Sequence, residues 1–364
     1  MEKLMRSFTK KFGEGSIRYL ADPSIVPSAL GYVPSGILPV DYVLGVPGVP
    51  LGRIVEIYGY ESTGKSAVLA SLLGMCQAMD GIAILVDSEH SYSSDWSTLF
   101  TVDPNKLILM QPAHLQEAGE QIIFICEELR KENPDVPVLI GIDSVAALPV
   151  VEELDRDTET HAVGLHARVL SRILRQITNL IWERRVAVVA INQQKERPPM
   201  GPAFAPGVSK IGGHSLDYHC CTQLRLSRTQ ILRDKGKVRG ITIRIFGAKN
   251  KVAPPFREST CSFYFDAGFD DFDFLLPLAV ELGLVERKGG GWYVWGDRKF
   301  QKNEFVSLGL EREIVSKYYG DSLGEVVYGV RQLRARNIDR GVPDNTSTGT
   351  EEAGEEGLKG PFTA

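Results

Sequence analysis

The 364 residues, of which 43% are hydrophobic and 24% are charged with a formal net charge of −5, exclude a fully disordered chain and accommodate one large core with a smaller domain. No uncharged apolar run is long enough to span a membrane, and the charged N-terminus has no signal-peptide pattern. Because five cysteines without metal-ligand spacing argue against a disulfide framework, we expect a cytoplasmic protein with no membrane partner.

The N-terminal stretch combines an amphipathic segment with a connector. Leu4, Phe8 and Phe12 recur at helical spacing with lysines between them, which predicts a short helix within residues 1–14. So short a helix needs a surface on which to bury its apolar stripe, either on its own chain or on a neighbouring subunit. The Pro- and Gly-rich stretch 23–50 that follows has little helical periodicity. We assign residues 1–36 to an N-terminal arm.

From residue 51 onward, apolar strands alternate with amphipathic helices. This order predicts an α/β fold with a mostly parallel central sheet and helices on both faces. In such a sheet the ligand crevice lies at the carboxyl ends of the strands. The predicted strands are 53–58, 81–86, 136–143 and 185–192, and the longer helices are 115–131 and 163–184.

The second half of the chain changes character twice. Residues 222–265 have the pattern of antiparallel strands, and residues 270–335 that of short helices with an aromatic hairpin at 291–295. Residues 341–364 carry five acids and one lysine, a net charge of −4, which leaves −1 for the rest of the chain. We therefore predict a core at 37–268, a small C-terminal α/β domain at 269–335 and a disordered acidic tail at 336–364.

A phosphate-binding loop follows the first predicted strand of the core. The motif G-x-x-x-x-G-K-[ST] needs glycines so that the backbone closes around phosphate at a helix N-terminus. Lys65 would act catalytically on the β- and γ-phosphates of ATP, and the Ser66 hydroxyl would bind Mg²⁺. An ordinary glycine turn is the alternative. The loop residues are Gly59, Tyr60, Glu61, Ser62, Thr63, Gly64, Lys65 and Ser66.

Polar residues close the other predicted strands of the core. Asp143 ends an apolar strand and is a candidate Mg²⁺ ligand, with a helix-capping Asp as the alternative. Glu89 follows a neighbouring strand and is suited to deprotonating a water molecule, unless it is a surface charge. Gln193, which ends a further strand, can both donate and accept hydrogen bonds near a γ-phosphate.

Several segments together resemble the RecA recombinases of bacteria and bacteriophages. They occur in that family's order and spacing over roughly residues 10–300. The segments are 11–17, 53–59, 87–90 (Asp-Ser-Glu-His), 142–148, 191–193, 249–251 (Lys-Asn-Lys) and 290–293.

The resemblance implies a RecA-like ATPase core that is completed by a neighbouring subunit. It assigns Glu89 as the catalytic base, Trp96 as the ring stacked on adenine and Gln193 as the link from γ-phosphate to DNA. It also implies that the N-terminal arm supports polymerisation. Lys249, Lys251 and Tyr218 would act across the subunit interface. Asp217 stands where the family commonly has lysine.

Two loops and one basic cluster are candidate DNA-binding elements. The first loop, at about 156–163, ends at Val163 and leads into a helix with Arg168, Ser171 and Arg175. A flexible surface loop or a solvated charged face is the alternative in each case. The second loop, at 194–213 with the residue that follows it, contributes Lys195, Met200, Phe204, Gly212, Gly213 and His214, and a duplex-gathering cluster would contain Lys288, Lys299 and Lys302.

The expected function is that of an ATP-dependent homologous recombinase. Such a protein forms a homopolymeric filament on single-stranded DNA, pairs it with homologous double-stranded DNA and exchanges strands, with ATP and Mg²⁺ as cofactors. Recombination mediators and a single-strand-binding protein would be further partners. The alternatives are a ring-forming motor or helicase with the same core, and a non-hydrolysing recombination mediator.

Overall fold

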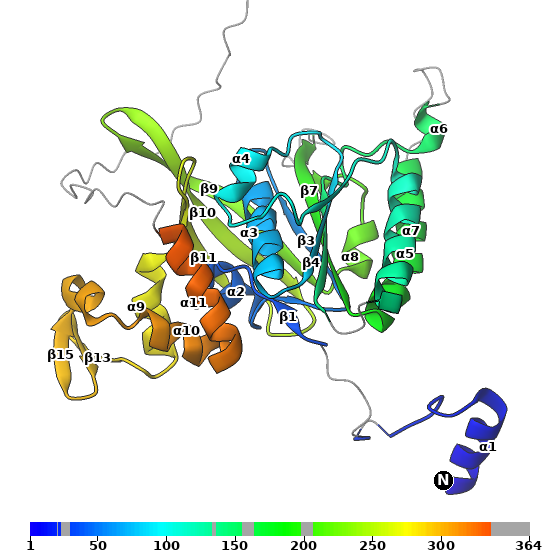
Figure 1. The fold of residues 1–364 in the computed structure, drawn as a ribbon, viewed down its shortest axis with the longest axis horizontal. Helices are drawn as coiled ribbons and strands as arrows, with labels where there is room; N and C mark the ends of the chain where they lie inside the picture. Colours follow the sequence, from blue (N-terminus) through cyan, green and yellow to red (C-terminus); the bar gives the residue numbers. More distant parts are fainter. Residues whose placement is uncertain (20, 23–29, 133–135, 155–163, 198–206, 336–364) are drawn as a thin grey trace, which may run out of the picture.

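The computed structural model describes residues 1–364 except residue 20 and the segments 23–29, 133–135, 155–163, 198–206 and 336–364 (Figure 1). Its centre is a large sheet in which nine strands follow the order β12-β11-β10-β9-β3-β7-β6-β4-β5, with β8 paired to β7. The strands are β3 (Ile54–Gly59), β4 (Ile82–Asp87), β5 (Ile108–Met110), β6 (Val138–Asp143), β7 (Val186–Arg197), β8 (Gly207–Lys210), β9 (Thr222–Asp234), β10 (Lys237–Asn250), β11 (Glu258–Tyr264) and β12 (Gly268–Asp270).

From β9 to β5 in this order, neighbouring strands are parallel, which confirms the predicted α/β class. β3 pairs in parallel with both β7 and β9, and β6 pairs in parallel with β4 and β7. The register places Gly59 opposite Gln193 and Asp87 opposite Asp143. The carboxyl ends of β3, β4 and β6, and the Gln193 position on β7, therefore lie side by side.

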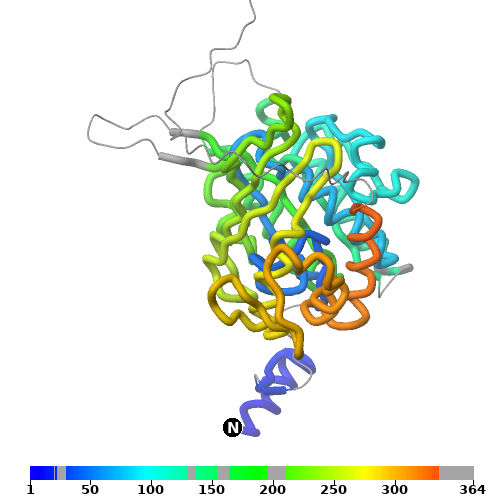
Figure 2. Tube along the Cα trace, turned by 90° about the vertical axis from the view of Figure 1, so that its left-hand side faces the viewer, coloured from blue at the N-terminus to red at the C-terminus, as the bar shows by residue number. Residues whose placement is uncertain are grey.

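Helices cover both faces of the parallel strands, as predicted (Figures 1 and 2). On one face α3 (Lys65–Ala78) buries almost every side chain in the apolar cluster that includes Val55, Ile57 and Leu139. On the other face α5 (Leu115–Glu132) and α7 (Leu165–Glu183) pack together over Ile140 and Val188. Small elements on this core are α4 (Ser94–Thr98), α6 (Val151–Leu154) and α8 (Ser215–His219).

The second half of the sheet is antiparallel, again as predicted, but its strands are longer than the sequence pattern indicates. β9 and β10 pair along nearly their whole length and project beyond the body as a hairpin (Figure 1). β11 then pairs with β10, and β12 pairs with β11. This arrangement returns the chain to the core next to the phosphate loop, where Phe263 and Phe265 lie at the end of β11.

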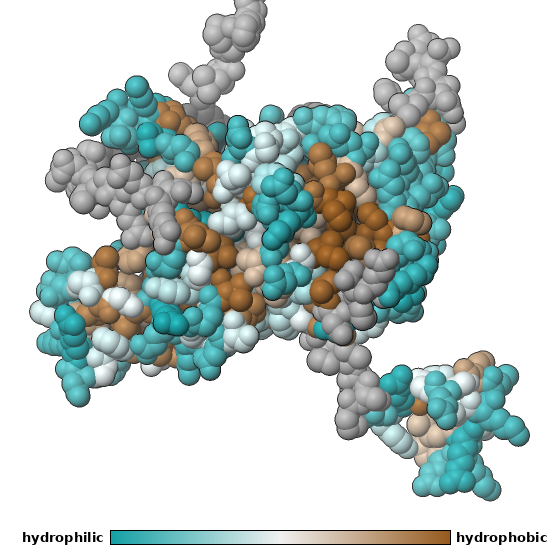
Figure 3. All heavy atoms as spheres, in the orientation of Figure 1, coloured by the Kyte–Doolittle hydropathy of each residue, from teal (hydrophilic) through white to brown (hydrophobic). Residues whose placement is uncertain are grey.

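The N-terminal helix stands apart from the body. Figures 2 and 3 show α1 (Glu2–Phe12) separate from the rest of the described chain. It has no buried residue, and Leu4 and Phe12 are more than half exposed. The connector that follows has little helical periodicity in its sequence, yet it contains the buried α2 (Leu38–Leu44) between β1 (Tyr32–Val33) and β2 (Val49–Pro50). Proline is tolerated in the first helical turn, where its missing N–H has no intrahelical partner.

The last described elements form a group that packs in one apolar cluster, together with Leu38 of α2 and Met75 of α3. The division of the chain into four domains stays a prediction, and the acidic tail lies outside the described residues. Among the described residues, no helix is both long enough and apolar enough to cross a bilayer. The elements of this C-terminal group are α9 (Phe272–Glu281), β13 (Glu286–Gly289), β14 (Trp292–Trp295), β15 (Arg298–Gln301), the 3₁₀ helix η1 (Lys302–Leu308), α10 (Glu311–Tyr319) and α11 (Asp321–Ala335).

Candidate active site

The loop between β3 and α3 has the geometry that its glycines permit. A Cβ atom at Gly59 would lie 2.2 Å from the carbonyl oxygen of Leu226, and Gly64 adopts a φ of +84° as α3 begins. Only glycine meets both demands without strain. The Tyr60 carbonyl accepts hydrogen bonds from Lys65 Nζ at 2.7 Å and Thr63 Oγ1 at 2.9 Å, which close the loop on itself.

Lys65 is a buried cation at the start of α3, with 8% of its surface exposed. Burial lowers the pKa of Lys65, whereas the negative charges of Asp143 and Glu89 act in the opposite direction. Burial disfavours the charged form of Lys65, and the negative charge of a bound phosphate would stabilise that form.

Asp143 ends β6 and lies next to the phosphate loop. Burial raises the pKa of its carboxyl to about 6, although a hydrogen bond with Ser66 acts in the opposite direction. A hydroxyl and a carboxylate are hard oxygen donors, which is the ligand type that Mg²⁺ prefers. The residues present thus fit a magnesium ion that is shared with nucleotide phosphates.

Glu89 lies in the turn beyond β4 and faces the same edge of the sheet. Its Oε1 atom accepts hydrogen bonds from Ser144 Oγ at 2.6 Å and from Gln193 Nε2 at 3.5 Å. Gln193 does not end a strand, as the sequence suggested, because β7 continues to Arg197 and pairs with β8. The strand itself therefore connects Gln193 to the second loop.

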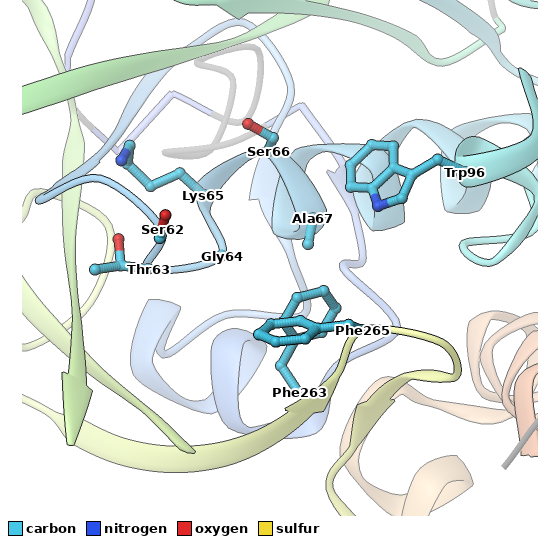
Figure 4. A pocket seen from close by; sticks show the side chains of 9 residues that line it. All are labelled: Ser62, Thr63, Gly64, Lys65, Ser66, Ala67, Trp96, Phe263 and Phe265. Carbon is cyan, nitrogen blue, oxygen red and sulfur yellow. The ribbon is translucent and has the colours of Figure 1, made fainter. Parts of the chain in front are cut away.

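A cavity of about 420 Å³ adjoins the phosphate loop. In Figure 4, Trp96 approaches from α4 on one side, and Phe263 of β11 and Phe265 just after it approach on the other, with Ala67 between them. The sequence reasoning included Trp96 but missed both phenylalanines. Their i, i+2 spacing is typical of two side chains on the same side of an extended chain, and this pattern in the sequence could have indicated a shared role. Three aromatic rings beside a phosphate loop suit a planar base.

A buried polar cluster supports the base of the second loop. Glu56 is fully buried in β3, and its carboxylate accepts hydrogen bonds from Asn192 and Lys210, each at 2.8 Å, and from Gln223 at 2.5 Å. Lys210 and Gln223 also donate to the carboxylate of Asp217. These contacts fix Lys210 to the sheet, where it anchors the base of the second loop.

Candidate DNA-binding residues on α7 lie close to those in the segment that leads into α8. Arg168 and Arg175 are exposed on α7, while Ser171 between them donates its hydroxyl hydrogen bond to Ser215 Oγ at 2.9 Å. Lys195 is exposed on β7. Gly212 and Gly213 have φ values of +77° and +60°, and His214 Nδ1 lies 2.8 Å from Asp217 Oδ2. Val163, Met200 and Phe204 lie outside the described residues.

The residues expected at a subunit interface occupy one end of the antiparallel strands. Tyr218 on α8 is 77% exposed, and Lys251 is exposed just after β10. Lys249 is half-buried and donates a hydrogen bond to the main-chain carbonyl of Asp217. Lys288, Lys299 and Lys302 are exposed in the C-terminal group, where Lys288 pairs with Glu286 at 2.5 Å and Lys299 lies over the Trp292 ring at 4.6 Å.

The strand, glycine loop and helix, with a carboxylate at the end of a nearby parallel strand, define a P-loop nucleotide-binding protein. The model of the RecA N-terminal domain matches residues 1–270. Protein RecA of Oleidesulfovibrio alaskensis is 34% identical over 81% of this chain and 81% of its own length. Protein RecA of Bacteroides thetaiotaomicron is 33% identical over 82% and 87%, and that of Chlorobaculum parvum is 33% identical over 93% and 92%. The chain belongs to the RecA family, whose role is in DNA recombination and repair.

Proposed function

We propose that this chain is an ATP-dependent homologous recombinase of the cytoplasm, bacterial or of a phage-infected host. It forms a filament on single-stranded DNA, pairs that strand with a homologous duplex and exchanges the strands. The observation that carries the proposal is the meeting of Lys65, Glu89, Asp143 and Gln193 at one edge of the sheet. Gln193 lies on the same strand that enters the second loop.

The site divides the work of hydrolysis among its residues. The backbone N–H groups of the loop and the N-terminus of α3 bind phosphate oxygens, and Lys65 stabilises negative charge on them. Ser66 and Asp143 would hold Mg²⁺, which when bound offsets phosphate charge. Glu89 accepts a proton from the attacking water, and the hydrogen bond from Ser144 holds its carboxylate in place.

Gln193 links the nucleotide to DNA through the structure of β7. Its Nε2 atom faces Glu89, and its backbone carbonyl accepts a hydrogen bond from the Ile211 N–H at the far end of the second loop. The adjacent Asn192 donates from Nδ2 to Glu56 and to the Ile211 carbonyl. A shift of Gln193 toward a γ-phosphate would therefore move both ends of the loop that carries Lys195, Gly212 and Gly213.

Assembly into a filament accounts for surfaces that a single chain leaves uncovered. None of the described residues buries the apolar stripe of α1, and Ile108 and Leu109 on β5 are also exposed. Tyr218, Lys249 and Lys251 would reach the nucleotide of the next subunit. Many weak DNA contacts then add along one polymer, which allows a chain of low net charge to coat DNA. Recombination mediators and a single-strand-binding protein would act on the same filament.

Measuring ATP hydrolysis with and without single-stranded DNA, and imaging the same samples by electron microscopy, tests the proposal. We expect DNA-stimulated hydrolysis together with helical filaments, both lost in Lys65→Ala. Closed hexamers without filaments would instead support a ring-forming motor, and DNA binding without hydrolysis would support a mediator. Homology-dependent strand exchange then separates a recombinase from a DNA-stimulated ATPase of another kind.

A further inference from the structure

The last described helix reaches from the C-terminal group into the core through one arginine. Arg334 lies one residue before the end of α11 and is 8% exposed. Its Nη1 atom donates to Ser71 Oγ at 2.7 Å, and its Nη2 atom donates to the carbonyl of Phe100 at 2.9 Å. Further contacts join the guanidinium to the Ser71 carbonyl at 3.2 Å, Thr101 Oγ1 at 3.3 Å and the Ser35 carbonyl at 3.5 Å.

Apart from the Ser35 carbonyl, these acceptors belong to the two segments that form the nucleotide site. Ser71 lies in α3, the helix that begins with Lys65. Phe100 follows α4, the helix that carries Trp96. The guanidinium therefore ties the phosphate-loop helix to the segment that supplies an aromatic wall of the cavity.

Phe100 is the support behind that wall. Its ring is 1% exposed and lies 4.8 Å from the Trp96 ring and 6.3 Å from the Phe263 ring, measured between centroids. Trp96 and Phe263 both line the cavity. Thr101, the next residue, has a φ of +62°, which a residue with a side chain rarely adopts without support from its surroundings. Hydrogen bonds to Phe100 and Thr101 supply such support.

The planar guanidinium suits this position better than an ammonium group would. It presents several N–H donors in a fixed fork and so bridges separate acceptors at once. All of the acceptors named above are neutral, so Arg334 forms no ion pair with them. Its contribution to the site is to hold these acceptors at fixed distances from one another. Burial and the nearby Arg331 lower the pKa of Arg334 to about 10, which leaves the guanidinium charged at neutral pH.

We propose that Arg334 is a positioning residue for the base half of the nucleotide site. It holds the Phe100 backbone against α3, and the Phe100 ring in turn sets the positions of Trp96 and Phe263. The proposal rests on the proposed function, in which Trp96 stacks on adenine. It gives the C-terminal group a direct influence on nucleotide affinity.

Arg331 provides a matched control on the same helix. It is also 8% exposed, but its guanidinium donates to Asp271 at 2.6 Å and to Glu311 at 2.9 Å. Those partners belong to the C-terminal group and its junction with α2. Substitution of either arginine removes a buried cation, whereas only Arg334 contacts the Phe100 segment and α3.

The experiment compares a ligand that has a base with one that lacks it. In a background where Trp182, Trp292 and Trp295 are changed to Phe, the remaining Trp96 reports on the cavity by its fluorescence. ATP and inorganic tripolyphosphate are each titrated into Arg334→Gln, Arg334→Lys and Arg331→Gln, with thermal unfolding as a measure of stability. If the proposed function is correct, the background protein binds ATP more tightly than tripolyphosphate.

We expect Arg334→Gln to weaken ATP binding about tenfold or more while tripolyphosphate binding stays within about twofold, since small displacements of supporting groups have effects of this size. In Arg334→Gln, Trp96 emission should differ from that of the background protein before any nucleotide is added. The ATP affinity of Arg334→Lys should lie between those of the background protein and Arg334→Gln. Arg331→Gln should lower the unfolding temperature without altering the ratio of the two affinities. Equal weakening of both ligands by Arg334→Gln, or no change in either, would overturn the proposal. Arg334→Lys carries the test if Arg334→Gln does not fold.

Discussion

Lys249 donates a hydrogen bond from its ammonium group to the main-chain carbonyl of Asp217 in its own chain. The carboxylate of Asp217 meanwhile accepts hydrogen bonds from Lys210 and Gln223. Partial burial raises the pKa of Asp217, but these hydrogen bonds outweigh it and lower the pKa to about 2. One residue thus joins the lysine proposed to act on the next subunit to the lysine at the base of the second loop. A lysine at position 217 would place a cation here instead.

Replacing Lys249 and Lys251 together by alanine should leave nucleotide binding to the isolated chain intact. DNA-stimulated hydrolysis should fall by about 10³-fold, as for other cations that reach a phosphate in trans. Steady-state ATPase assays with and without single-stranded DNA measure the effect. Lys235→Ala with Lys237→Ala, at the exposed turn between β9 and β10, is the matched control. Unchanged ATPase in the Lys249/Lys251 variant would refute a site shared between subunits.

Glu89→Gln should bind ATP normally and hydrolyse it about 10²- to 10⁴-fold more slowly, the usual contribution of a general base. An amide retains an oxygen that accepts the Ser144 hydrogen bond but cannot take a proton from water. Single-turnover hydrolysis with bound ATP separates the chemical step from binding. Glu61→Gln removes a charge from the phosphate loop and should leave the chemical step within a few-fold. Near-normal turnover by Glu89→Gln would assign the base elsewhere.

Phe265→Ser should weaken ATP binding about tenfold, the scale of one aromatic–base stacking contact. Phe265 lines the cavity yet is 49% exposed, so its loss should cost the fold little. Equilibrium titration with ATP gives the affinity, and tripolyphosphate should bind as before. Phe256→Ser, at a 69% exposed phenylalanine away from the cavity, serves as the control. Equal ATP affinities in the two variants would mean that Phe265 does not face the base.

Asp41 should make the free energy of unfolding depend on pH. It is fully buried in α2, where it accepts hydrogen bonds from the Ser35 backbone and from Tyr319 Oη at 2.6 Å. Burial raises the pKa of Asp41 from 3.8 to about 7. Between these two pKa values the folded chain keeps a proton that the unfolded chain releases. The free energy of unfolding should therefore fall as the pH rises from about 4 to about 7, by up to about 1.4 kcal/mol per pH unit.

Urea unfolding of the wild type and of Asp41→Asn across this range isolates the contribution of Asp41. The asparagine side chain does not titrate, so the difference in unfolding free energy between the two proteins should change with pH below about 7 and level off above it. Other carboxyls titrate equally in both proteins and cancel. A pH-independent difference would show that Asp41 ionises as it does in the unfolded chain.

The phosphate loop and the parallel strands were predictable because their signals are local. Gly59 to Ser66 is a contiguous motif, and runs of β-branched residues such as those before Asp143 indicate buried strands. The relative positions of Glu89 and Asp143 followed from one rule, that parallel strands end on the same edge of a sheet. Gln193 lies at that edge within a strand that continues to Arg197, which the rule does not predict.

Other features depend on contacts that no local pattern contains. Phe263 and Phe265 reach the cavity only because three antiparallel strands bring the chain back to the loop. The Glu56–Lys210 pair spans 154 residues, and Glu56 alone reads as a charge within a strand. α2 is buried on almost every side, so it has no polar face to produce a helical period.

The position of β3 in the sheet has a consequence for how the protein opens. β3 lies between β7 and β9, in the interior of the nine-strand order, whereas β5 and β12 are its edges. Amide hydrogens of interior strands exchange with solvent only in the rarest openings, while edge strands exchange early. The phosphate loop is therefore anchored in the most slowly exchanging part of the sheet. In the proposed filament, release of a spent nucleotide would therefore come from moving loops and neighbouring subunits, with the strand beneath it unchanged.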